Sequence, residues 1–290
     1  MRLAKRQEDE SPSSIIRPGP EDLQPTATDA TPGTGTATST ESLVLATSTE
    51  GPSSLPLPFD TSLGSNFTSP SCPTFFKTFL SDPTFQSCLP FSLLLQNSQG
   101  FFQASKSAFR ITSILDATCN VDVNACASYM GQLGSQIRKT ESCGADFNRE
   151  NPLVLQAYRG LVSYQPLYQA GCLRDSSGNY CYANAITNAS SSTDSYPYYL
   201  PLGMTMPGGA RPTCNTCLES IMAIFANAAQ NGTQPVSQTY ASAAKQINLG
   251  CGPDFVNTTV TVRTSAASTP SPLGGIYQVL AFFMLMAYFF

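Results

Sequence analysis

The chain has 290 residues, a formal net charge of −4, ten cysteines and no histidine. The absence of histidine excludes Ser-His-Asp catalysis, Cys-His catalysis and histidine metal sites, because each of these needs an imidazole. The acidic balance leaves no basic patch that could neutralise phosphates, so we expect no binding to nucleic acid.

Residues 1–70 have the composition of a disordered leader. Between residues 11 and 70, 31 of 60 residues are Ser, Thr or Pro. Such sequence buries too little apolar surface to offset the entropy of ordering it, and it is also typical of O-glycosylated stalks. The opening Met-Arg-Leu-Ala-Lys-Arg lacks the apolar stretch of a secretory signal peptide, so we expect that signal upstream of this sequence.

Residues 71–256 are predicted to form a cysteine-rich helical domain that contains all ten cysteines. An even number of cysteines confined to one region indicates disulfides and an oxidising compartment. These residues are Cys72, Cys88, Cys119, Cys126, Cys143, Cys172, Cys181, Cys214, Cys217 and Cys251. Four sequons agree with secretion and predict exposed glycosylated sites at Asn66, Asn188, Asn231 and Asn257.

Apolar spacing predicts a mostly α fold. Residues recur at helical intervals over 101–115, 126–137 and 218–229, and a further helix is expected over 236–249. Asp82-Pro83 and Asn151-Pro152 place a capping side chain before a proline at the first helical position. Gly250 and Gly252 are stop signals around Cys251.

The domain divides into two halves, 72–150 and 151–256, that suggest a duplication. Each half holds five cysteines and ends in one signature, Cys143-Gly-Ala-Asp-Phe147 or Cys251-Gly-Pro-Asp-Phe255. Because five is odd, full pairing requires at least one disulfide between the halves. The pairing itself stays open.

Two motifs could carry chemistry. Asp146 and Asp254 are the pair of carboxylates that an acid/base hydrolase would need. We expect instead a repeated turn in which each aspartate binds nearby backbone N–H groups, because a duplicated turn explains both aspartates at once. Cys214-Asn-Thr-Cys217 has the spacing of a redox dithiol, but also that of two structural cysteines on one helical face. We therefore predict no catalytic residue, no cofactor site and no metal site.

A tyrosine-rich loop is the candidate binding surface. Tyr196, Tyr198 and Tyr199 lie in a proline-bounded segment, and tyrosine is favoured at binding surfaces because it joins apolar area to a polar tip. The alternative is a loop that folds its tyrosines onto the core.

The C-terminal segments resemble a lipid-anchor signal. A linker, 257–275, precedes an uncharged tail, 276–290, that is short for a transmembrane helix of roughly 20 residues. Small residues, a spacer and an apolar tail form a GPI signal. The expected anchor region is Ser265, Ala266, Ala267 and Ser268. A transmembrane helix is the alternative.

The motifs Phe79-Leu-Ser-Asp-Pro-Thr-Phe85 and Cys88-Leu-Pro-Phe91, with the two Cys-Gly-x-Asp-Phe signatures, resemble an uncharacterised family of fungal GPI-anchored, cysteine-rich cell-surface proteins. The resemblance covers about 72–255 and implies a location but no activity. The chain is also similar to the fungal CFEM domains, whose haem is held through an aspartate. Asp122 would be the corresponding residue, but their tight Cys-x-Cys is missing here.

Together these patterns predict a non-enzymatic protein on the extracellular face of the plasma membrane or in the cell wall. Its role would be structural, adhesive or ligand-contacting. The expected partners are the membrane, through the lipid anchor, and wall glycans or surface proteins. A small-molecule or haem-binding module is the first alternative, and an Asp-dependent wall-glycan hydrolase is the second.

Overall fold

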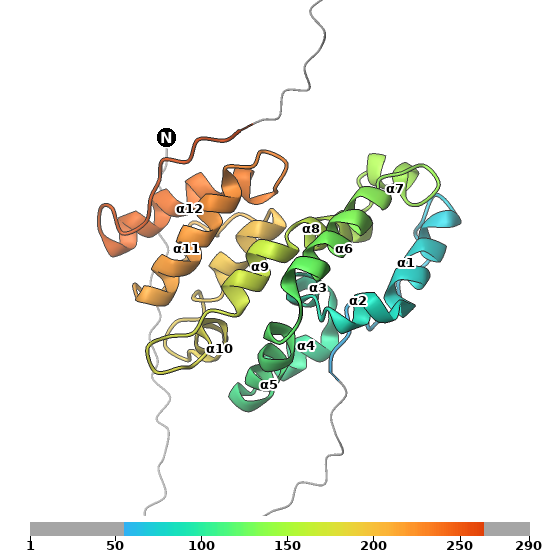
Figure 1. Cartoon of the computed structure of the whole chain (residues 1–290). Coiled ribbons are helices and arrows are strands. Elements are labelled where there is room, and N and C mark those ends of the chain that lie inside the picture. Colours follow the sequence, from blue (N-terminus) through green and yellow to red (C-terminus); the bar gives the residue numbers. More distant parts are fainter. Residues whose placement is uncertain (1–54, 264–290) are drawn as a thin grey trace, which may run out of the picture. The chain divides into compact units, whose positions relative to one another are not determined.

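Residues 55–263 are described by a computed structural model and are almost entirely helical (Figure 1). The helices are α1 Ser71–Ser81, α2 Pro83–Ser87, α3 Phe91–Asn97, α4 Gln99–Ala104, α5 Ala108–Cys119, α6 Val123–Gln136, α7 Gly144–Asn148, α8 Pro152–Val162, α9 Tyr164–Gly171, α10 Cys181–Thr187, the 3₁₀ helix η1 Tyr196–Leu202, α11 Thr216–Ala229 and α12 Val236–Cys251. Within this range no strand forms, and only two isolated bridges occur, Arg174–Tyr180 and Asn231–Arg263. The prediction of a mostly α fold is confirmed.

The local start and stop signals work as expected. Asp82 accepts a hydrogen bond from the N–H of Thr84, and Asn151 accepts one from the N–H of Leu153, so both caps begin their helices. At the other end, α12 stops at Gly252, whose φ of 103° lies in the region that favours glycine.

One predicted helix is wrong. The stretch 101–115 is not continuous but breaks into α4 and α5 at Ser105–Ser107. The hydroxyl of Ser107 accepts a hydrogen bond from the N–H of Arg110 and caps the start of α5. The serine side chain thus bonds to the backbone and begins a new helix instead of continuing the first one. Ala108, which the periodicity assigned to the buried face, is exposed.

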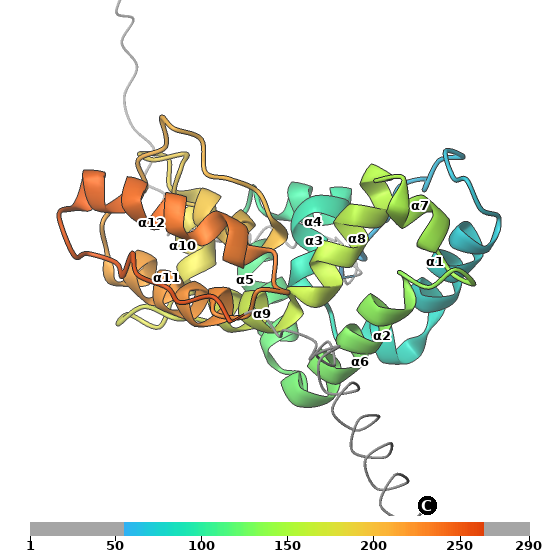
Figure 2. The ribbon, with the colours of Figure 1, turned by 90° about the horizontal axis from the view of Figure 1, so that it is seen from above.

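Helices α3 and α9 lie between two hydrophobic cores (Figures 1 and 2). Five consecutive residues of α3, 91–95, are buried, as expected for a helix that has no solvent-facing side. Leu93 of α3 and Tyr164 of α9 belong to one core, whereas Phe91 and Leu167 belong to the other. The two helices therefore join the cores into one packed unit.

We call these the first core and the second core. The first is built around Phe76, Met130 and Leu161 and draws mainly on α1, α2, α6 and α8. The second is built around Phe225 and Tyr240 and draws mainly on α5, α10, η1, α11 and α12.

The cores do not follow the predicted halves. Helix α8 lies in the second half of the sequence but packs in the first core, and α5 lies in the first half but packs in the second core. The repeated signature also differs in structure: Cys143 precedes the short helix α7, whereas Cys251 ends α12. The halves therefore exchange helices instead of folding separately.

All ten cysteines are paired, as predicted. The disulfides are Cys72–Cys143, Cys88–Cys126, Cys119–Cys172, Cys181–Cys217 and Cys214–Cys251. The sequence predicted that at least one disulfide joins the halves, and in the structure this bond is Cys119–Cys172. In each half the second cysteine pairs with the fourth, across 38 and 36 residues, and this is the one pairing that the halves share.

The predicted end of the leader at residue 70 is wrong, because residues 55–70 belong to the folded unit. The buried ring of Phe59 packs edge-on against Phe76, with centroids 5.3 Å apart. The carboxylate of Asp60 accepts from the N–H groups of Gln99 and Gly100 at the start of α4. The folded unit therefore begins before residue 71, although the composition of residues 55–70 is typical of disorder.

The chain also stays packed past residue 256, where the linker was expected to begin. The hydroxyl of Tyr240 donates to the carbonyl oxygen of Asn257 at 2.6 Å. The rest of the leader, the anchor residues 265–268 and the tail 276–290 lie outside the described residues. Between residues 55 and 263, no helix is both long enough and apolar enough to cross a membrane.

Candidate functional site

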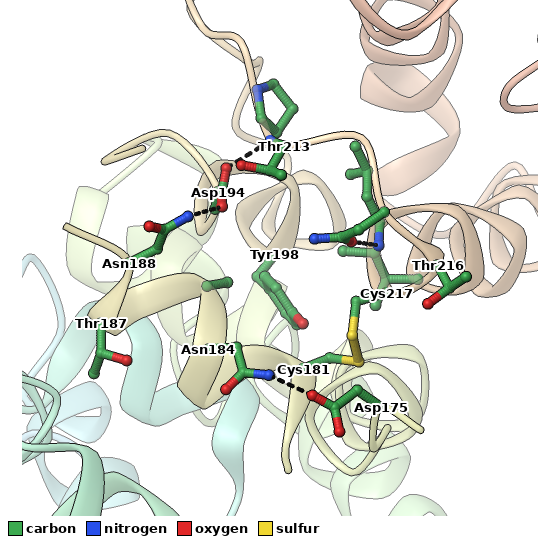
Figure 3. Close-up of a pocket in the computed structure, with 15 residues that line it drawn as sticks. Asp175, Cys181, Asn184, Thr187, Asn188, Asp194, Tyr198, Thr213, Thr216 and Cys217 are labelled. Carbon is green, nitrogen blue, oxygen red and sulfur yellow. Dashed lines mark hydrogen bonds between the residues drawn. A yellow bond between two sulfur atoms is a disulfide. The ribbon is translucent and has the colours of Figure 1, made fainter. Parts of the chain in front are cut away.

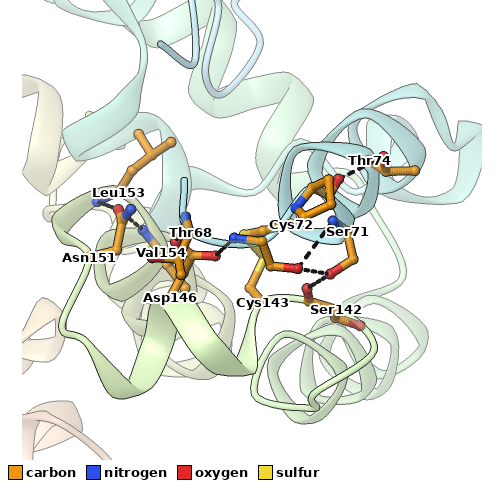
Figure 4. The surroundings of a disulfide bond; sticks show 12 residues. Thr68, Ser71, Cys72, Thr74, Ser142, Cys143, Asp146, Asn151, Leu153 and Val154 are labelled. Carbon is orange, nitrogen blue, oxygen red and sulfur yellow. Dashed lines mark hydrogen bonds between the residues drawn. A yellow bond between two sulfur atoms is a disulfide. The ribbon is translucent and has the colours of Figure 1, made fainter. Parts of the chain in front are cut away.

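Asp146 and Asp254 lie in different environments, one buried and one exposed. Asp146 is fully buried, and its carboxylate accepts from the N–H groups of Thr68 at 2.6 Å and Ser69 at 3.2 Å, next to the Cys72–Cys143 disulfide (Figure 4). It thus ties the segment before α1 to α7, across more than seventy residues, and does not cap the local turn that we expected. Its role in the structure is to hold the N-terminal segment in place.

Asp254 has a different environment from Asp146. It is exposed, and its backbone φ is 64°, the left-handed conformation that aspartate tolerates better than most residues. The shared Cys-Gly-x-Asp-Phe sequence therefore gives one buried anchor and one exposed turn residue.

The cysteine motif and Asp122 also have structural roles. Cys214 pairs with Cys251 and Cys217 pairs with Cys181, so the two cysteines of the motif are not bonded to each other. Asp122 accepts from the N–H groups of Asn124 and Ala125 and caps α6. The motif therefore holds no disulfide between its own two cysteines, and Asp122 acts as a helix cap.

The three tyrosines of η1 pack onto the second core instead of forming an exposed surface. Tyr198 is buried, and its ring lies 4.8 Å from that of Tyr182 in an edge-to-face arrangement. Tyr196 and Tyr199 are partly buried against the same core. The prediction of a tyrosine binding surface is therefore wrong for Tyr198, because aromatic packing stabilises the inward orientation.

Tyr198 nevertheless lies in the wall of a pocket, which we call the Asp194 pocket (Figure 3). Its volume is about 360 Å³, within the range of roughly 300–1,000 Å³ typical of small-molecule sites. The pocket lies between α10, the loop that follows it, η1 and the start of α11. Its polar lining is Asp175, Asn184, Thr187, Asn188, Asp194, Thr213, Asn215 and Thr216.

Two carboxylates are held rigidly in this wall. Asp194 accepts from the hydroxyl of Ser191, the N–H of Thr213 and the amide of Asn188, each at 2.7 Å. Burial alone would raise the pKa of Asp194, but these three hydrogen bonds outweigh that effect and hold its pKa below the usual range. Asp194 therefore stays ionised at mildly acidic pH.

Asp175 is held in the same way. It accepts from the N–H groups of Asn179 and Ser177 at 2.9 Å, and from the amide of Asn184 at 2.8 Å. The N–H of Asn179 contributes most to the lowered pKa of Asp175. The pocket consequently carries two negative charges.

The rest of the lining is apolar except for one hydroxyl group. Leu218, Ile221 and the Cys181–Cys217 disulfide line this part. Figure 3 shows the ring of Tyr198 directed into the group of lining residues. Its hydroxyl is buried and has no hydrogen-bond partner among the described residues. A buried hydroxyl in this state is destabilising by about 1–3 kcal/mol, and a water or ligand oxygen would relieve it.

The charges in the lining of the pocket favour neutral or cationic ligands over anions. No Lys or Arg belongs to its lining, so phosphates and other anions would meet two carboxylates without compensation. Ionised carboxylates only accept hydrogen bonds, whereas the amides and hydroxyls both donate and accept. The pocket therefore suits a small neutral or cationic molecule that carries several hydroxyl or amino groups.

The sequons differ in how they are placed. Asn66, Asn231 and Asn257 are exposed, as the sequence predicts for glycan acceptors. Asn188 is half-buried, lines the Asp194 pocket and donates its side-chain amide to Asp194. Its amide is thus part of the pocket, and a glycan there would stand inside it.

No local sequence pattern predicts this pocket. Its polar residues come from four segments between residues 175 and 216 and follow no periodic pattern. One signal was available, since Asp194 begins the proline-bounded loop that was noted for its tyrosines. An aspartate in a loop often accepts hydrogen bonds from nearby backbone N–H groups, and Asp194 does so from the N–H of Thr213.

No curated protein and no solved structure is detectably similar to the chain. A family of domains of unknown function, DUF7729, matches residues 54–260, which includes every helix described above and both lining carboxylates. The folded unit and the family match thus have nearly the same limits, and the chain belongs to the DUF7729 family.

Proposed function

We propose that this protein is a non-enzymatic surface protein that binds a small hydroxyl- or amine-bearing ligand, of the kind found in cell-wall glycans, in the Asp194 pocket. The single observation that carries the proposal is the lining of this pocket: two ionised carboxylates, several amides and hydroxyls, no cationic side chain, and one buried hydroxyl without a partner.

The location follows from the disulfides. Five disulfides in one unit indicate an extracellular or secreted protein, because reducing compartments keep such thiols unpaired. Attachment to the cell surface through a lipid at the C-terminus is part of the proposal, and it is supported by the small residues and apolar tail of the sequence. Release of the protein from cells by phosphatidylinositol-specific phospholipase C tests the anchor. Retention after this treatment would contradict it.

The absence of catalysis is also a proposal. It is supported by Asp146, which is buried and bound to backbone N–H groups, and by Asp254, which is exposed on a turn. In the Asp194 pocket both carboxylates have lowered pKa values, whereas a general acid for glycoside hydrolysis needs a raised one. The pocket is therefore suited to binding and not to proton donation.

The binding test uses oligosaccharides that differ in one feature. Isothermal titration of the secreted protein with glucosamine oligomers, their N-acetylated counterparts and a sugar phosphate separates amine, neutral and anionic ligands. We expect the amine-bearing oligomers to bind most tightly and the sugar phosphate not to bind. Binding of the phosphate alone would contradict the proposal.

A matched pair of variants locates the site. Tyr198→Phe removes only the buried hydroxyl, and we expect it to weaken ligand binding without destabilising the free protein, because that hydroxyl has no partner to lose. Tyr199→Phe is the control, since Tyr199 is the adjacent residue of η1 and does not line the pocket. Equal effects of the two variants on binding would place the ligand elsewhere.

A further inference from the structure

A second polar depression crosses α9 away from the Asp194 pocket. Two neighbouring cavities of about 220 and 190 Å³ share Gln165 and Gln234 in their walls, and we call the two together the Gln234 groove. The lining residues that matter for its ligand are Tyr158, Tyr164, Pro166, Ile224, Asn231 and Thr233. None of its lining residues is charged, in contrast to the Asp194 pocket.

The groove contains two polar atoms that lack partners. Tyr164 is 2% exposed, and its hydroxyl has no hydrogen bond among the described residues. The side-chain carbonyl oxygen of Gln234 is in the same state, although its amide donates to the carbonyl of Val162. One of these groups can donate and the other can only accept. A ligand with hydroxyl or amide groups that reached both would satisfy them.

The groove also contains a predicted glycan acceptor in its own wall. Asn231 lines the smaller cavity, and Thr233, the third residue of its sequon, lines the larger one. The side-chain oxygen of Asn231 accepts from both the N–H and the hydroxyl of Thr233, at 3.0 and 2.8 Å. Its side-chain amide forms no hydrogen bond within residues 55–263 and is free to carry a sugar.

The loop that carries Asn231 is fixed by the backbone on both sides. The N–H of Gly232 donates to the carbonyl of Arg263, and the N–H of Arg263 donates to the carbonyl of Gln230. A sugar attached to this rigid position would begin in the groove, because the attachment residue is part of the groove's wall.

We propose that the Gln234 groove holds the first sugar of an N-linked glycan on Asn231. The chemistry of the groove fits N-acetylglucosamine, which is neutral and carries hydroxyls and one acetamide. Glutamine and asparagine side chains can donate to and accept from these groups, while Tyr158, Pro166 and Ile224 offer apolar surface to the sugar ring. Each cavity is smaller than a typical drug-sized pocket, which suits a single ring.

The glycan would connect the two cores. Tyr158, Leu161 and Tyr164 pack in or against the first core, whereas Ile224 packs against the second. A sugar held in the groove would therefore contact both, and removing it would lower the stability of the whole unit.

The test begins with glycan mapping of the secreted protein by mass spectrometry, because this inference rests on the secretion proposed above. Occupancy of Asn66 or Asn257 with an empty Asn231 would overturn the inference and leave the proposed location intact. An absence of glycan at every sequon would overturn the inference in the same way, whereas the proposed location has its own test in the phospholipase treatment.

Enzymatic trimming then separates the first sugar from the rest. An endoglycosidase that leaves one N-acetylglucosamine should not change the melting temperature. Complete removal by an amidase should lower it by roughly 2–4 °C, a shift of the size expected for one lost interaction in a domain of this length. Asn231→Gln should lower it equally, whereas Asn66→Gln and Asn257→Gln should not. Unchanged stability after complete removal would overturn the inference.

A double-mutant cycle identifies the contact. If the hydroxyl of Tyr164 binds the glycan, Tyr164→Phe lowers the melting temperature of the glycosylated protein but not that of Asn231→Gln. Equal effects of Tyr164→Phe in both backgrounds would show that its hydroxyl does not contact the sugar, and this would overturn the proposed position of the sugar in the groove.

Discussion

Removal of the Cys119–Cys172 disulfide, by Cys119→Ala with Cys172→Ala, should destabilise the protein without dividing it. This bond closes a loop of 53 residues, and none of the other four disulfides provides a shorter covalent path between its ends. The chain-entropy relation for a loop of this length gives a loss of about 4 kcal/mol in the free energy of unfolding. For a domain of this size that corresponds to a fall in melting temperature of roughly 8–16 °C.

The number of transitions is the more informative part of the result. Because α5 and α8 each pack in the core of the opposite half, we expect the variant to unfold in a single cooperative step. Calorimetry and urea unfolding, followed by circular dichroism and by tyrosine fluorescence since the chain has no Trp, measure both quantities. Tyr168→Phe is the control, because it removes the hydroxyl that donates to the carbonyl of Cys119 while keeping the disulfide.

Two separate transitions in the double variant would refute the reasoning, because they would mean that the halves fold independently and that the disulfide alone joins them. A loss of less than about 1 kcal/mol would also count against it, since the unfolded chain would then gain little freedom from the opened loop. Tyr168→Phe should lower stability by only about 0.5–1.5 kcal/mol, the usual contribution of one hydrogen bond.

Three further predictions follow from local geometry. Gly160→Ala should destabilise the protein by about 1–3 kcal/mol because the added Cβ would overlap a methyl carbon of Leu93. Gly131→Ala is the matched control in helix α6: its added Cβ would meet nothing within 4 Å, and it should stabilise the protein by up to about 1 kcal/mol in urea unfolding. Asp194 has a lowered pKa, so its contribution to stability is present above its unfolded pKa of about 4 and is lost as the pH falls through the folded value. Melting temperatures between pH 2 and 6 should fall less steeply for Asp194→Asn. Peptide mapping should find Asn188 unmodified, because its amide is bonded to Asp194 inside the pocket.

Each of these has a clear contrary outcome. Equal stability of the two glycine variants would mean that α8 can move away from α3 without loss. A pH profile of Asp194→Asn that parallels the original protein would show that this carboxylate contributes nothing to acid sensitivity. A glycan found on Asn188 would mean that the sugar occupies the pocket and that the hydrogen bond from Asn188 to Asp194 is not kept in the secreted protein.

Helix positions could be predicted because their signals are local. An aspartate or asparagine before a proline defines a helix start within four residues, and both Asp82 and Asn151 act as the sequence indicates. The apolar face of α11 was predicted from spacing alone, and each of its predicted core residues is buried. The break at Ser107 was missed because a capping serine and a helical serine look alike without their hydrogen bonds.

The candidate site could not be predicted in the same way. Asp194 and Asp175 are ordinary loop aspartates in the sequence, and they line one pocket beside α10 and the start of α11, which the Cys181–Cys217 disulfide joins. The tyrosine motif indicated the loop that lines the pocket, but it predicted an exposed contact surface. Tyr198 is instead a buried residue in the pocket wall.

Composition, parity and short-range periodicity were enough to predict the helical class, the oxidised cysteines and the need for a bond between the halves. Which cysteines pair, which helices change cores and where polar groups remain without partners became apparent only in the folded chain. These properties depend on contacts between residues that are distant in the chain, and the free energy of such contacts is set by packing that no local pattern encodes. The same tertiary packing separates Asp146 from Asp254, which carry one signature in the sequence and have two different roles in the fold.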